Sequence, residues 1–189
     1  MKIIRPLIAS FVLLTAVTGV VYPLVVTGVG KVAFSHQVNG SLIEKDGKVL
    51  GSTLIGQHFS DPKHFWGRPS GAGTFEYNGL ASGGSNQGPT NPALKAAIED
   101  RIKALHDADP ENTAAIPVDL VTASGSGLDP EISPAAANYQ LQRVAKARGL
   151  KTEQVRDLIA QHTQEPQLGL FGEARVNVLE LNLALDQLH

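Results

Sequence analysis

Residues 6–30 read PLIASFVLLTAVTGVVYPLVVTGVG and contain no charged side chain. Because an α-helix rises 1.5 Å per residue, these 25 residues can cross a hydrocarbon core of about 30 Å with some tilt. The stretch therefore predicts one membrane-spanning helix that begins at Pro6 and ends at Gly30, so that residues 1–33 form an N-terminal membrane anchor. The alternative is a cleaved secretory signal, but the run exceeds a usual signal core of roughly 7–15 residues and has no clear A-x-A cleavage site.

Three residues inside the span are expected to shape its packing. Pro23 has no N–H donor and is expected to kink the helix, which membrane proteins tolerate when neighbouring groups satisfy the freed carbonyl. Thr15 and Gly19 are four residues apart and therefore share one helix face. Such a pair of small residues allows a second helix to approach closely. We expect contacts with partner helices as well as with membrane lipid.

The charges that flank the span predict its orientation. Lys2 and Arg5 precede it and only Lys31 follows closely, so the positive-inside rule places the N-terminus in the cytoplasm and residues 34–189 outside, which in a bacterium is the periplasm. All eighteen acidic but only thirteen of the sixteen basic residues lie in 34–189, which gives this part a net charge of −5. That charge argues against nucleic-acid binding, which requires clustered Lys and Arg.

Residues 34–189 show the mixed pattern of a compact extracytoplasmic α+β domain with a small β-sheet and three or four helices. Asp46-Gly47 between two apolar stretches predicts a β-hairpin. Asn91-Pro92 predicts the start of a helix that ends before Pro110. The other predicted elements are a short strand at 118–122, a helix at 134–149, a helix that starts with Thr152 as its cap, and a strand followed by a helix at 175–188.

Residues 60–92 are rich in Gly, Ser, Asn and Pro, and a structureless loop of this length is unusual in a compact domain. Because it holds the single tryptophan and several other aromatic residues, we expect a packed loop and not a mobile one. Large aromatic and arginine side chains dominate protein interfaces, so the expected partner-docking residues are Phe65, Trp66, Arg68 and Tyr77. Internal packing of the same side chains is the equally weighted alternative.

The sequence offers little support for catalysis. It has no cysteine, its six histidines show no H-E-x-x-H spacing, and no Walker A motif is present. Ser124 and Ser126 do not lie in a G-x-S-x-G motif. The helix spacing at 145–155 is similar to that of a helix-turn-helix, but the net charge favours an ordinary helical corner. We therefore predict no catalytic residue, no metal site and no cofactor of its own.

Five strings together resemble the C-subunit family of the Kdp potassium-transporting ATPase. They are FWGRPS (65–70), SGGSN (82–86), NP-x-L (91–94), DLVTASGSGLDP-x-ISP (119–134) and RVNVL (175–179). With the single N-terminal span, the resemblance covers essentially the whole chain.

The resemblance implies a small single-span protein of the bacterial inner membrane. Its partners would be a potassium-channel-like subunit, a P-type ATPase subunit and a very small helper subunit, and the complex as a whole would handle ATP and potassium. The resemblance further implies a catalytic chaperone that raises the ATP affinity of the pump subunit, with a nucleotide contact at Ser82, Gly83, Gly84 and Ser85.

The predicted orientation favours a non-catalytic accessory subunit over direct nucleotide binding, because an external domain cannot touch cytoplasmic ATP. We expect the domain to dock on the outer face of the channel-like subunit and to stabilise the complex. Two alternatives stay open at this stage. One is a cytoplasmic module that acts on ATP affinity, and the other is a periplasmic, membrane-tethered hydrolase that uses Ser124 or Ser126.

Overall fold

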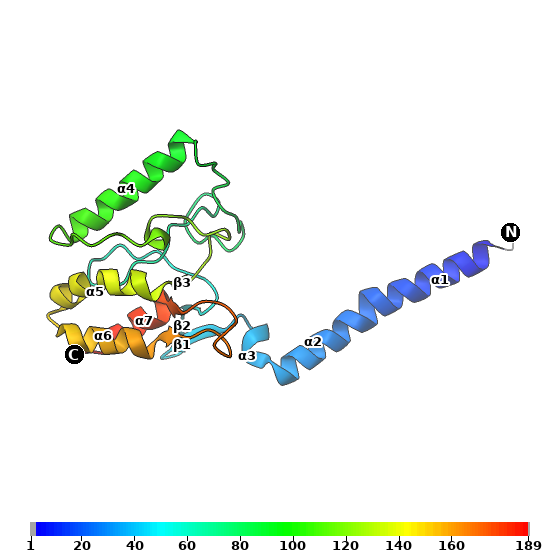
Figure 1. Cartoon of the computed structure of the whole chain (residues 1–189). Helices are drawn as coiled ribbons and strands as arrows, with labels where there is room; N and C mark the ends of the chain where they lie inside the picture. Colours follow the sequence, from blue (N-terminus) through cyan, green and yellow to red (C-terminus); the bar gives the residue numbers. More distant parts are fainter. Residues whose placement is uncertain (1–2, 189) are drawn as a thin grey trace. The chain divides into compact units, whose positions relative to one another are not determined.

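The computed structural model describes residues 3–188, and the chain divides into two compact units, Met1–Leu42 and Ile43–His189. The first unit consists of helix α1 (Ile4–Ala16), a π-helical turn η1 (Val17–Val21), helix α2 (Tyr22–Ala33) and the short helix α3 (Ser35–Val38) (Figure 1). Together Ile4–Ala33 form one helix of 30 residues that is long and apolar enough to cross a membrane, and none of its most apolar window is buried. The predicted candidate span is confirmed as a helix.

A π-helical turn lies just before Pro23, the residue at which a kink is predicted. The Tyr22 N–H donates to the carbonyl of Val17, five residues back, which is the spacing of a π-turn. Because Pro23 has no N–H, the helix must change its hydrogen-bond spacing near this residue. Thr15 and Gly19 do lie on one face: a Cβ built at Gly19 would be 4.0 Å from the Thr15 methyl group.

The second unit begins with a β-hairpin, as predicted. Strands β1 (Leu42–Lys45) and β2 (Lys48–Ser52) pair with each other across Asp46-Gly47. Both turn residues have positive φ angles, 54° and 72°, which is the geometry of the type I′ turn that Asp-Gly favours. The expected single sheet is thus accompanied by a second, separate one.

The second sheet has three short antiparallel strands in the order β3 (Glu131–Ile132), β5 (Arg175–Asn177), β4 (Thr163–Gln164). Val176 at its centre pairs with Ile132 on one side and Thr163 on the other. Helices α5 (Pro134–Arg148), α6 (Thr152–Gln161) and α7 (Val178–Leu185) lie with this sheet in the lower part of Figure 1. Their apolar faces and β5 form one hydrophobic core, which includes Leu141, Val144, Val155, Leu158, Ile159, Val176, Leu181 and Leu185.

The helix starts follow the predicted capping chemistry, with one shift. Asn91 accepts a hydrogen bond from the N–H of Ala93 (2.9 Å) and begins α4 (Pro92–Ala108). Ser133 caps α5, and Gly149 ends it in the left-handed conformation with φ 67°. The prediction that Thr152 caps α6 is wrong by one residue, because the cap is Lys151, whose N–H donates to the side chain of Gln154 (3.0 Å).

The predicted strand at 118–122 is wrong. Val118–Leu120 form a 3₁₀ helix, η2, in which the N–H of Val121 donates to the carbonyl of Val118 (3.1 Å). The carbonyl of Leu120, which a strand would offer to a neighbouring strand, accepts instead from Nε of Arg101 on α4 (3.0 Å). β-propensity depends strongly on context, and in this context the short apolar run forms a helical turn.

Candidate functional site

The FWGRPS string passes through the interior of the domain. Phe65 is 0% exposed and Trp66 is 6% exposed. Neither residue belongs to a strand, so their backbone polar groups require other partners. Two buried side-chain amides supply them. Asn182 on α7 accepts from the N–H of Phe65 (2.8 Å) and donates to its carbonyl (3.0 Å), and Gln140 on α5 does the same for Trp66 (2.8 and 3.0 Å).

The indole ring of Trp66 contacts two arginines. The guanidinium carbons of Arg143 and Arg101 lie 4.7 Å and 5.2 Å from the ring centroid, within the range of a cation–π interaction. Burial lowers the pKa of Arg143 to about 10. Its guanidinium donates to the carbonyl of Pro62 and to Oε1 of Gln140, which offsets part of the desolvation. The ring is therefore held from within the domain.

Arg68 and Tyr77 lie at the edge of this buried segment and stay partly exposed. The Tyr77 hydroxyl donates to the carbonyl of Arg68 (2.6 Å), and Arg68 Nη1 donates to Asp129 Oδ2 (3.0 Å). Burial, with the negative charge of Glu76 as the next cause, raises the pKa of Tyr77 to about 12. The four predicted docking residues thus lie close together in the fold. Phe65 and Trp66, however, are buried beneath the surface. For these two residues the structure matches the alternative of internal packing.

The SGGS string contacts the SGSG string. The N–H of Gly83 donates to the carbonyl of Ser126 (2.8 Å), and the hydroxyl of Ser82 donates to the same carbonyl (3.1 Å). Gly127 has a φ of +66°, and a Cβ there would lie 2.6 Å from the carbonyl oxygen of Gly83. The contact between the two strings therefore requires glycine at position 127, where a side chain would collide with the Gly83 carbonyl.

The hydroxyls of Ser124 and Ser126 act in the same turn. Ser124 Oγ accepts from the N–H of Gly127 (2.8 Å) and Ser126 Oγ accepts from the N–H of Leu128 (3.1 Å). Within residues 3–188 neither hydroxyl bonds to a histidine or a carboxylate, the partner that an activated nucleophile needs. This geometry is typical of a serine-stabilised turn.

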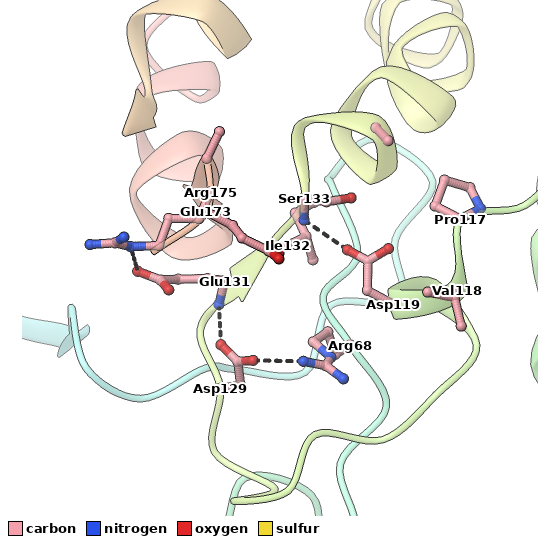
Figure 2. Close-up of a pocket in the computed structure, with 12 residues that line it drawn as sticks. Arg68, Pro117, Val118, Asp119, Asp129, Glu131, Ile132, Ser133, Glu173 and Arg175 are labelled. Atoms are coloured by element: carbon pink, nitrogen blue, oxygen red, sulfur yellow. Dashed lines mark hydrogen bonds and ion pairs between the residues drawn. The ribbon is translucent and has the colours of Figure 1, made fainter. Parts of the chain in front are cut away.

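A hollow of about 680 Å³ lies beside this loop pair, between η2, β3 and the start of α5 (Figure 2). Asp129 binds Arg68, Glu131 binds Arg175 through Nε (2.8 Å), and Asp119 accepts from the N–H of Ser133 (2.7 Å). The charged residues that line the hollow are Arg68, Asp119, Asp129, Glu131, Glu173 and Arg175.

With four carboxylates and two guanidiniums, the lining of the hollow is acidic overall. Among residues 3–188 no group of three or more His, Asp or Glu side chains is arranged to hold a metal ion. The charged side chains shown in Figure 2 instead fasten the segments around the hollow to one another, because Arg68–Asp129 joins the FWGRPS string to the end of the SGSG turn. The arrangement suits contact with a polar or basic surface.

Five residues that organise this site were not among the predicted site residues, namely Gln140, Asn182, Arg101, Arg143 and Asp129. For Gln140 and Asn182 the sequence pattern itself gave an indication. Gln140 and Asn182 lie on the apolar faces of their helices, where a polar residue interrupts a run of buried positions. A buried amide must find a partner, but the sequence does not say which one.

Comparison with known proteins gives matches along nearly the whole chain. The model of the family KdpC, described as K+-transporting ATPase, c chain, matches residues 4–187. A potassium-transporting ATPase KdpC subunit of Polaromonas naphthalenivorans is 63% identical over 187 residues, which cover 99% of this chain and 95% of the relative. The KdpC subunits of Variovorax paradoxus and Methylococcus capsulatus are 62% and 61% identical, with at least 96% of each chain covered.

Proposed function

The chain belongs to the KdpC family, the c chain of the K+-transporting ATPase, and from this premise we propose that it is the non-catalytic accessory subunit that stabilises the potassium-importing complex. Its partners in this proposal are a channel-like potassium-translocating subunit, a P-type ATPase subunit and a small helper subunit. These partners bind ATP and potassium, and the present chain requires no cofactor. It would serve as an anchored scaffold.

The observation that carries the proposal is that the SGGS and SGSG strings bind to each other through backbone contacts. Gly83 and Ser82 donate to the carbonyl of Ser126, and the packing at Gly127 leaves no space between the two backbones. A phosphate-binding loop needs backbone N–H groups that point at the ligand, whereas the N–H of Gly83 is already used inside the domain. This supports a scaffolding role for these loops and weighs against a nucleotide contact at Ser82, Gly83, Gly84 and Ser85.

The proposed orientation has the N-terminus in the cytoplasm and the second unit in the periplasm of a bacterial cell, with the span in the inner membrane. The support is the flanking charge, with Lys2 and Arg5 before the apolar helix and Lys31 after it. In this orientation the chain raises the ATP affinity of the pump subunit only indirectly. The coupling would pass through helix packing, for which the small face at Thr15 and Gly19 is suited.

A topology experiment on the assembled complex tests this proposal. The full chain with a tag after His189 is expressed with its partner subunits, and protease is added to sealed right-side-out vesicles. We expect the tag to be lost at the rate seen after detergent lysis, while a cytoplasmic domain of the ATPase subunit stays protected as the control. If the tag survives until lysis, the second unit is cytoplasmic, and the module that acts directly on ATP affinity becomes the better explanation.

Co-purification tests the accessory role separately. A tag on this chain should retain the channel-like and ATPase subunits through detergent extraction, and the chain purified alone should hydrolyse neither ATP nor a generic ester. Hydrolysis by the isolated chain that is lost on Ser124→Ala or Ser126→Ala would favour the tethered hydrolase instead.

A further inference from the structure

Three large apolar side chains project from the connection between β4 and β5. Leu168, Leu170 and Phe171 are 89%, 82% and 64% exposed, and we call these three residues the apolar finger. Singly exposed apolar residues are common on protein surfaces, but three in four consecutive positions are not. The finger contributes nothing to the core of its own domain.

The finger is a folded turn. The N–H of Gln167 donates to the carbonyl of Phe171 and the N–H of Phe171 donates back to Gln167, both at 2.9 Å. A further bond joins the N–H of Gly169 to the carbonyl of Pro166 (3.0 Å), and Leu168 and Gly169 both have positive φ angles. The turn therefore presents preformed apolar side chains, which lowers the entropy lost on binding.

The strand that follows the finger is bonded to the end of the hairpin near the start of the second unit. Strand β5 follows the finger, and Asn177 at its end donates to the carbonyl of Thr53 (2.8 Å), just after β2. Because β1 and β2 are joined by a two-residue turn, Leu42 at the start of β1 lies beside the end of β2. Phe171 is six residues from Asn177, a reach of at most about 20 Å.

The tether restricts what the finger can meet. Only residues 34–42 separate the end of α2 from the second unit, and even fully extended these nine residues would span at most about 30 Å. Two kinds of surface lie within this reach, the lipid headgroups and the extramembrane parts of membrane-embedded proteins. The charge of the segment around the finger favours a protein surface over the lipid headgroups. Residues 163–174 contain Glu165 and Glu173 but no Lys or Arg, whereas segments that bind a lipid surface are typically rich in Lys and Arg.

We propose that the apolar finger is a docking anchor that inserts into an apolar cleft on the extramembrane surface of a membrane-embedded subunit of the pump complex. The inference rests on the proposed accessory function. Glu173 and Arg175, which follow the finger, line the charged hollow described above. The surface thus combines an apolar centre with a charged border, as in specific protein interfaces.

The chain contains no cysteine, so single-cysteine labelling tests the proposal directly. Leu170→Cys is labelled with a membrane-impermeant maleimide, in the assembled complex and in the chain alone in lipid nanodiscs. We expect labelling in the complex to be at least tenfold slower than in the chain alone. Ala96→Cys is the matched control, because Ala96 is exposed on helix α4, outside the finger and outside the loop at 60–92, and its labelling rate should be the same in both samples.

Two labelling results would overturn the proposal. Rapid reaction of Leu170→Cys in both samples means that the finger is free, and slow reaction in both means that it inserts into lipid without a partner. A triple variant, Leu168→Ser with Leu170→Ser and Phe171→Ser, should retain its circular dichroism and lower the recovery of partner subunits at least tenfold. Unchanged recovery would also overturn the anchor role. A wild-type chain that recovers no partner would instead contradict the proposed accessory function.

Discussion

The side-chain amides of Asn182 and Gln140 act as substitutes for strand neighbours. Each one satisfies both the N–H and the carbonyl of a buried loop residue, Phe65 or Trp66. Without them, four backbone polar groups would be desolvated with no partner, and each such group costs roughly 1–3 kcal/mol. Single residues on α5 and α7 therefore determine where the FWGRPS string lies.

Replacing Asn182 is expected to be strongly destabilising. Asn182→Ala removes both bonds to Phe65 in the core, so we expect the free energy of unfolding to fall by about 2–4 kcal/mol. Urea unfolding followed by tryptophan fluorescence measures the change. Asn138→Ala is the control, because Asn138 is exposed and its side chain bonds only to Pro134 in its own helix (2.8 Å). Equal effects of the two substitutions would contradict the stabilising role of the Asn182 bonds to Phe65.

The close contact between Gly127 and the Gly83 carbonyl gives a second prediction for a single residue. Gly127→Ala places a Cβ 2.6 Å from the carbonyl oxygen of Gly83 at a φ of +66°, so we expect a loss of more than about 2 kcal/mol from strain and displaced backbone together. At Gly125 a Cβ would have no atom within 4 Å. Gly125→Ala should therefore change stability by less than about 0.5 kcal/mol. Thermal unfolding of the two variants compares them, and a reversed order would refute the close packing.

The raised pKa of Tyr77 leads us to expect a loss of folding stability at high pH. Its folded-state pKa is about 12, above the ordinary value of 10.0, so the folded chain holds the phenolic proton more tightly than the unfolded chain. The resulting stabilisation is complete below pH 10 and is lost as the pH rises from 10 to 12, by up to about 2 kcal/mol. The measurement is the difference in unfolding free energy between wild type and Tyr77→Phe from pH 8 to 12. A difference that stays constant across this range would show that the hydroxyl is not protected.

At the scale of secondary structure elements, the junction between β3 and α5 is fastened from two sides. Ser133 Oγ accepts from the N–H of Ala136 (3.0 Å) and so caps α5, while the N–H of Ser133 donates to Asp119 on η2 (2.7 Å). The cap therefore connects three elements that lie around the charged hollow. η2 thus places the Asp119 carboxylate at the start of α5.

The cap can be tested by two substitutions at one position. Ser133→Ala removes the side-chain acceptor and should lower the free energy of unfolding by about 1 kcal/mol. Ser133→Thr keeps an oxygen in the same place and should restore most of that loss. Denaturant unfolding of the pair measures both values. If the threonine variant is as unstable as the alanine variant, the cap bond does not stabilise α5.

At the scale of the whole molecule, the second unit contains all the buried apolar residues that form the core. Every member of the core cluster lies between Phe65 and Leu185, whereas the most apolar window of the N-terminal helix has no buried residue. The second unit is therefore stabilised by its own interior, whereas the apolar surface of the N-terminal helix is not covered by the described chain itself.

This division predicts that the second unit folds without the anchor. Deletion of residues 1–33 should give a soluble domain with a cooperative urea transition whose free energy lies within about 0.5 kcal/mol of that of the full chain in nanodiscs. Circular dichroism and tryptophan fluorescence should report the same midpoint. Loss of the cooperative transition would mean that the anchor contributes to the folding of the domain.

The amino-acid sequence alone determined the features that depend on near neighbours along the chain. The apolar helix follows from 25 uncharged residues, the hairpin from Asp46-Gly47, and the starts of α4 and α5 from Asn91 and Ser133. In each case the decisive hydrogen bond or turn joins residues at most a few positions apart. The sequence also identified the family, because five strings of specific loop residues together are highly distinctive.

Only the tertiary structure decided which of these loop residues meet. Asn182 and Phe65 are 117 positions apart, Gln140 and Trp66 are 74 apart, and Ser82 and Ser126 are 44 apart. The sequence identified both glycine-rich strings but not their contact, and it could not decide between docking and internal packing for Phe65 and Trp66. The physical reason is that burial of a polar group, unlike the start of a helix, depends on which distant segment supplies its hydrogen bond.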